Sequence, residues 1–122
     1  MKNQTYRMTL LFDFFGDLLT DRQKEFYDLY YNEDLSLAEI AENCGITRQG
    51  VRDVIVRAEE ILTEMEDKTG IIHRFHQMQE HIKAVEDSLG AVIRLNEEKY
   101  QDDELEALCR QMLSSVSALK KE

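Results

Sequence analysis

The residues LAEIAENCGITRQGVRDVIV, from Leu37 to Val56, contain two apolar-periodic segments separated by a glycine. The spacing predicts two short helices joined by a tight turn at Cys44-Gly45-Ile46, with Gly45 in a left-handed backbone conformation. Ala41 is small at the point where the two helices would approach each other. The residues predicted to form their shared core are Ile40, Cys44, Ile46, Val51 and Val54. This combination is typical of a helix-turn-helix.

A helix-turn-helix directs the outward side chains of its second helix to the major groove of duplex DNA. Arg48 and Arg52 carry the paired donors that read guanine, and the amide of Gln49 suits adenine. Thr47 is placed to contact a phosphate through its hydroxyl or through the helix-start amide. The predicted nucleic-acid-binding residues are Thr47, Arg48, Gln49, Arg52, Asp53 and Arg57.

The amino-terminal segment predicts a helix that is apolar around most of its circumference. Thr5 is a candidate cap for a helix from Tyr6 to Leu19. One apolar stripe of this helix is formed by Leu11, Phe14, Phe15 and Leu18. Leu10, Phe12 and Leu19 lie off that stripe. A helix of this kind must be covered from more than one side, by other layers of the chain or by a second subunit.

Helix start and stop signals divide residues 20–70 into three further predicted helices. Thr20-Asp21-Arg22-Gln23 and Ser36-Leu37-Ala38-Glu39 both have the form of a capping box, which predicts two helix starts. Thr47 is predicted to cap a further helix that reaches about Glu66, and Gly70 is available for a left-handed helix end.

Beyond Gly70 the apolar residues follow a heptad rhythm, which predicts a long helix packed beside another helix. The residues in this rhythm are Ile71, Phe75, Met78, Ile82, Val85, Leu89 and Val92. Asn96 ends the pattern, and a last helix is predicted from about Asp103. The apolar face of that helix is predicted to consist of Leu105, Leu108, Met112, Val116 and Leu119. We expect an antiparallel hairpin that buries these stripes against itself, the front domain or a partner chain.

Composition favours an all-α protein. The 122 residues include no proline and five glycines, whereas average usage gives about six prolines in such a length. The predicted organisation is a helix-turn-helix domain over residues 1–69 and a carboxyl-terminal helical hairpin or dimerisation arm over residues 70–122. No run approaches the roughly 20 apolar residues of a membrane span, so a cytoplasmic protein is expected.

Candidates for catalysis and metal binding are weak. Cys44 and Cys109 are too few and too far apart for a thiolate zinc site. His73, His76 and Glu80 share one face of the long helix and could in principle hold a divalent metal, but the phase of that face, opposite the heptad stripe, favours a solvated surface. We find no nucleophile with a base and no phosphate-cradling glycine loop. The sequence therefore predicts no enzyme, no metal and no cofactor.

The segment SLAEIAENCGITRQGVRDVIVRAEEIL, residues 36–62, resembles region 4 of bacterial sigma factors in its Thr47-Arg48 and Val51-Arg52 pairs. With the aromatic helix before it and the helical arm after it, nearly the whole chain resembles the YlxM family of small bacterial helix-turn-helix proteins. Genes of that family typically lie beside genes of the signal recognition particle pathway. The resemblance implies a regulatory role there.

The charge balance leaves two functions open. The net charge is −10, and residues 20–66 carry five Lys or Arg against twelve Asp or Glu, whereas DNA-binding domains are usually basic. One hypothesis is a DNA-binding regulatory protein in which a homodimer doubles the contacts. The other is an acidic protein-interaction module that binds a component of the signal recognition particle or of the translation machinery without reading DNA.

Overall fold

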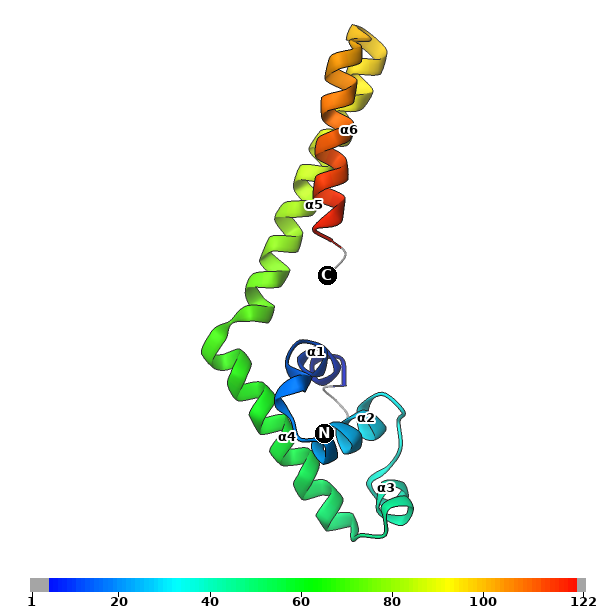
Figure 1. Ribbon diagram of the computed structural model, residues 1–122, viewed down its shortest axis with the longest axis vertical. Helices are drawn as coiled ribbons and strands as arrows, with labels where there is room; N and C mark the ends of the chain where they lie inside the picture. Colours follow the sequence, from blue (N-terminus) through cyan, green and yellow to red (C-terminus); the bar gives the residue numbers. More distant parts are fainter. Residues whose placement is uncertain (1–4, 121–122) are drawn as a thin grey trace. The chain divides into compact units, whose positions relative to one another are not determined.

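The computed structural model describes residues 5–120, and these form helices with no strand among them (Figure 1). Their contacts divide the chain into two units, Met1–Ile72 and His73–Glu122. The helices of the first half are α1 (Thr5–Phe15), the short 3₁₀ turn η2 (Gly16–Leu18), α2 (Asp21–Tyr31), α3 (Leu37–Cys44) and α4 (Arg48–Thr69). The second half contains α5 (Ile71–Leu95), the π-helical turn η3 (Asn96–Tyr100) and α6 (Asp103–Ala118). The predicted all-α class is confirmed.

Helix α4 is the centre of the amino-terminal unit, since α1, α2 and α3 all pack against it. Four of its side chains are fully buried, namely Val51, Ile55, Ala58 and Leu62. Tyr27 of α2 is buried beside them, and its hydroxyl donates a hydrogen bond of 2.7 Å to the carbonyl of Met8 in α1. The ring of Tyr27 stacks on Phe12 with 5.2 Å between centroids. These contacts tie α1 and α2 to each other as well as to α4.

The predicted caps at Thr20, Ser36 and Thr47 are confirmed, whereas Thr5, the predicted cap of the first helix, is itself the first helical residue of α1. Thr20 accepts a hydrogen bond from the Gln23 amide, and Ser36 accepts one from the Glu39 amide, both within the first turn of the helix. The side chains of Gln23 and Glu39 accept in return from the backbone amides of Thr20 and Ser36, which completes two capping boxes. Gly45 and Gly70 end α3 and α4 with positive φ angles of 70° and 63°. Helix α4 continues to Thr69, three residues beyond the predicted end at Glu66.

The prediction of one helix from Tyr6 to Leu19 is wrong at its end. Helix α1 stops at Phe15, and η2 follows. The change of winding turns Leu18, which was predicted to lie on the apolar stripe, out to solvent and turns Leu19 into the core. Gly16 is buried against the ring of Phe12, where an added Cβ would lie 3.3 Å from two ring carbons. That close approach explains a glycine where the stripe predicts continuous helix.

Within the carboxyl-terminal unit, α6 folds back along α5 as the predicted hairpin (Figure 1). Asn96 is buried at the turn, where its amide donates to the carbonyl of Asp102 at 2.9 Å and accepts from the Asp102 amide at 3.0 Å. At the other end of the hairpin, Lys120 and Ser117 reach Glu86 of α5. Polar contacts therefore hold both ends of the α6 segment against α5.

The hairpin buries only part of the predicted heptad stripe. Ile82, Leu89 and Ile93 of α5 and Cys109 of α6 are buried. Four other apolar residues of the predicted stripe are exposed on α5, namely Ile71, Met78, Val85 and Val92. On α6 the predicted face is likewise exposed at Leu108, Met112 and Leu119. The heptad residues of α5 are therefore divided between a buried row inside the hairpin and an exposed row on its surface.

Candidate nucleic-acid interface

The turn between α3 and α4 has the geometry that the sequence predicts for a helix-turn-helix. Gly45 adopts the left-handed conformation, and the Ile46 amide donates to the carbonyl of Ala41 at 3.2 Å. Ile40, Ala41 and Val51 are buried between the helices. Cys44, Ile46 and Val54 are half-buried and pack against this core. The sequence analysis did not place Ile55 in the core, although it is fully buried.

All six predicted contact residues are exposed on the amino-terminal half of α4 or at its cap, namely Thr47, Arg48, Gln49, Arg52, Asp53 and Arg57. The structure thus brings them together on one stretch of helix. The cap residue Thr47 accepts a hydrogen bond of 2.9 Å from the Gly50 amide. Its hydroxyl oxygen therefore serves the helix, while the hydroxyl proton is left to donate.

Hydrogen bonds along α4 restrict two of these side chains. Gln49 donates through Nε2 to Oδ1 of Asp53 at 2.8 Å, which fixes the amide along the helix surface. The amide oxygen and the second N–H proton of Gln49 remain for a base edge. Asp53 therefore restrains the orientation of the Gln49 amide.

The arginines differ in their partners. Arg57 forms an ion pair of 3.3 Å with Glu60, and both side chains are exposed. Among residues 5–120, neither Arg48 nor Arg52 has a carboxylate within 4 Å. The uncompensated positive charge of α4 is therefore concentrated at its first turns.

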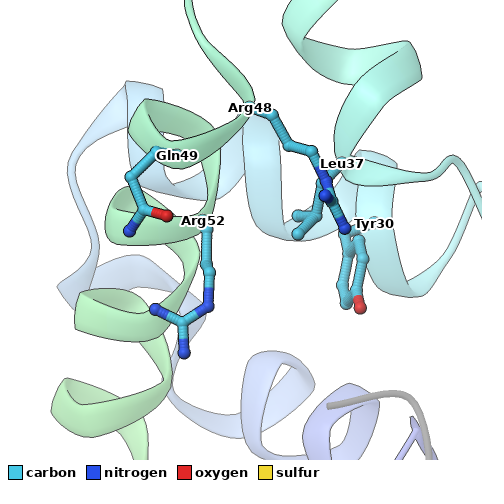
Figure 2. A pocket seen from close by; sticks show the side chains of 5 residues that line it. All are labelled: Tyr30, Leu37, Arg48, Gln49 and Arg52. Atoms are coloured by element: carbon cyan, nitrogen blue, oxygen red, sulfur yellow. The ribbon is translucent and has the colours of Figure 1, made fainter.

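A surface pocket of about 530 Å³ lies at this end of α4 (Figure 2). Arg48, Gln49 and Arg52 line it from α4, and Tyr30 of α2 and Leu37 of α3 complete it. In Figure 2 the Arg48 side chain extends over Leu37 towards Tyr30. Tyr30 is a buried core residue of α2 that also lines this pocket, and it was not among the predicted site residues. Only the packing of α2 against α4 brings the ring to the arginines.

The remainder of α4 is acidic. Burial raises the pKa of the Glu59 carboxyl above its usual range, although the neighbouring Tyr31 hydroxyl and the Arg52 guanidinium oppose that rise. Glu59, Glu60, Glu64 and Asp67 line a second groove of about 350 Å³ together with Met8, Val56 and Thr63. Helix α4 therefore carries opposite charge at its two ends.

Two further classes of site are absent from the described part of the chain. Over residues 5–120, no three His, Cys, Asp or Glu side chains are grouped so as to hold a metal ion. None of the helices in that range has the length and apolar character needed to cross a membrane.

A Gly-turned helix pair with an exposed, arginine-bearing second helix defines a helix-turn-helix protein. Residues 2–104 match the model of the UPF0122 family, described as "Putative helix-turn-helix protein, YlxM / p13 like". The chain belongs to this family, which confirms the resemblance drawn from the sequence.

Relatives in several bacteria carry the same family name. A UPF0122 protein of Desulforamulus reducens is 51% identical over 72 residues, which cover 59% of this chain and 62%, less than two thirds, of that relative. One of Bacillus mycoides is 42% identical over 101 residues, or 83% of this chain and 92% of the relative. One of Thermoanaerobacter is 37% identical over 112 residues, or 92% of each chain.

Proposed function

We propose that this protein is a DNA-binding regulatory protein that reads duplex DNA through the amino-terminal half of α4. The observation that carries the proposal is the pair Arg48 and Arg52, exposed on the first turns of the second helix of the motif and without carboxylate partners in the described part. Arginine at these positions supplies two parallel donors to O6 and N7 of guanine.

The other predicted residues take supporting roles in this proposal. Gln49, held by Asp53, presents its amide to an adenine. Thr47 and the free amides at the start of α4 contact a phosphate, because a helix start attracts anions. Arg57 adds charge one turn further along, reduced by its pairing with Glu60.

The acidic balance favours a homodimer, since two recognition helices double the number of phosphate and base contacts. The proposal assigns the protein to the cytoplasm, where bacterial DNA lies, and gives it no catalytic role. The family resemblance supports a regulatory connection to the signal recognition particle pathway.

The test is selection of bound duplexes from a random DNA pool at two salt concentrations. We expect an enriched sequence that the Arg48→Glu/Arg52→Glu variant no longer selects. The matched control is Lys68→Glu/Lys83→Glu, which changes the net charge equally at two exposed lysines outside the pocket. On the selected sequence, Arg48→Ala and Arg52→Ala should each weaken binding by about 1–3 kcal/mol.

Two results would contradict the proposal. One is the absence of any enriched sequence even at low salt, where phosphate contacts are strongest. The other is equal loss of binding in the arginine variant and the lysine control, since that would show a dependence on total charge alone.

The second candidate function is an acidic protein-interaction module, and the acidic groove on the rear half of α4 favours it. A basic surface of a signal recognition particle component or of the translation machinery suits this groove. Capture of such a component that survives Arg48→Glu and is lost in Glu60→Lys/Glu64→Lys would establish it. Phe12 is half-buried and Phe15 is buried, so replacing these residues would test the core rather than a docking surface.

A further inference from the structure

Exposed apolar side chains are concentrated on the α5–α6 hairpin. Of the eleven large apolar residues that are exposed among residues 5–120, eight lie between residues 73 and 120. Six of them form what we call the hairpin face, which consists of Met78, Val85 and Val92 of α5, Leu108 and Met112 of α6, and Leu119 directly after α6. Their exposed fractions run from 39% for Val92 to 55% for Met78 and Leu119.

The six residues lie on the same side of the hairpin. Met78, Val85 and Val92 are seven residues apart, so they follow one stripe along α5. This stripe flanks the buried row of Ile82 and Leu89 on one side, and helical geometry places Glu86 on the other side of that row.

Polar pairs close the hairpin on the side of Glu86. Lys120 pairs with Glu86 at 3.0 Å, and Arg110 pairs with Glu97 at 3.4 Å. On α6, helical geometry places Met112 and Leu119 on the flank away from Arg110 and Lys120. The two helices therefore present ion pairs on one side and the hairpin face on the other.

A groove joins apolar residues of both helices at one end of the hairpin face. Its volume is about 470 Å³, and Met78, Ile82, Val85, Val116 and Leu119 form its apolar walls. Ser88 and Ser115, which border the hairpin face, are exposed and uncharged. Arg74, which also lines the groove, is a charged residue at this border.

The core inside the hairpin is small. Its buried apolar side chains among residues 73–120 are Ile82, Leu89, Ile93 and Cys109. Two helices with so few buried side chains are marginal in water. In four-helix bundles each helix presents two adjacent apolar stripes to its neighbours, and α5 carries two such stripes although one hairpin fills only one of them.

We propose that a second copy of this chain covers the hairpin face, and that two hairpins form a two-fold symmetric four-helix bundle. A two-fold interface requires the same patch to be self-complementary, and an apolar face meets that requirement because apolar side chains pack against copies of themselves. Residues 73–122 carry seven Lys or Arg and ten Asp or Glu, against eight and fifteen in residues 1–72. The hairpin is thus the half of the acidic chain in which self-association meets less repulsion.

This inference rests on the proposed function and deepens it, because it names the surface through which a dimer with two recognition helices would form. Its test contains no DNA, so the failure of DNA readout and the failure of the dimer are separate results.

The experiment measures molecular mass by sedimentation equilibrium over a range of concentrations. We expect the parent chain to have twice its 14.3 kDa. The variants Val85→Glu/Val92→Glu/Met112→Glu and Val85→Lys/Val92→Lys/Met112→Lys should each be monomeric. An equal mixture of the two should regain the dimer mass, because opposite charges then face each other across the symmetric interface. Leu18→Glu, which charges an exposed apolar residue of the other unit, should remain dimeric.

Three outcomes would overturn the proposal: a parent chain that is monomeric at every concentration, a dimer that survives either triple substitution, or a mixture of the two variants that stays monomeric. Recovery in the mixture also excludes simple unfolding as the reason for monomeric variants, because a chain that cannot fold has no face to pair.

Discussion

Replacing Gly45 by alanine tests the turn on which the helix-turn-helix depends. Gly45 has φ 70° and ψ 29°, a left-handed conformation in which a Cβ atom approaches its own backbone. For an L-residue this conformation costs about 1–2 kcal/mol. Alanine also restricts the unfolded chain, which returns about 0.4–1 kcal/mol. The expected net loss is about 1 kcal/mol in the free energy of unfolding.

Packing contributes nothing to the expected loss of unfolding free energy in Gly45→Ala. An ideal Cβ built on Gly45 has no neighbouring heavy atom within 4 Å. The loss therefore comes from backbone conformation alone. Gly45→Asn provides the matched control, since asparagine enters the left-handed region more readily than alanine and should lose less stability.

Urea unfolding followed by far-ultraviolet circular dichroism measures the effect. A lower midpoint with an unchanged slope is expected for Gly45→Ala, with Gly45→Asn between it and the parent chain. For a unit of this size, 1 kcal/mol corresponds to about 4–8 °C in Tm. An alanine variant as stable as the parent, or an asparagine variant less stable than alanine, would show that Gly45 is not held in the left-handed region.

Two further substitutions probe α4. Thr47→Ala removes the acceptor of the Gly50 amide and should lower the free energy of unfolding by about 1 kcal/mol. Thr47→Ser keeps a hydroxyl acceptor and should retain most of the parent's stability. Equal stability of all three chains in urea would disprove the cap. Glu59→Gln tests the raised pKa of Glu59: the unfolded chain deprotonates first as pH rises, so the charged carboxylate costs stability at neutral pH. The Gln variant should therefore have the higher Tm at pH 7, and the gain should disappear below about pH 4.3. Exposed Glu42→Gln is the control, and a gain independent of pH would refute the account.

The elements that sequence predicts well are those fixed by local hydrogen bonds. The capping boxes at Thr20 and Ser36 form as predicted, and so do the left-handed ends at Gly45 and Gly70. In each case the side chain and the backbone group that it satisfies, or the glycine and its own φ angle, lie within one helical turn. Such signals do not depend on how the rest of the chain folds.

Predictions fail where an outcome depends on what a helix packs against. Helical periodicity placed Leu18 in the core, yet the chain changes from α-helix to a 3₁₀ turn at Gly16, and Leu18 is exposed. Periodicity also grouped Ile82 with Val85, although α6 covers only the first. Tyr30 reaches the arginine pocket because α2 packs against α4, and no spacing along the sequence encodes that packing.

The distribution of charge along α4 reconciles an acidic chain with the proposed DNA readout. Non-specific affinity grows with the number of phosphates that Lys and Arg neutralise, and this helix offers only Arg48 and Arg52 without a carboxylate partner. Its rear half, with Glu60 and Glu64 exposed, would be repelled by phosphates, so only the amino-terminal turns can approach a duplex. The expected binding is therefore weak on arbitrary DNA and depends on base contacts. A dimer with two recognition helices gains from such contacts twice, because the second half-site doubles both the base contacts that discriminate between sequences and the few phosphate contacts that each helix can make.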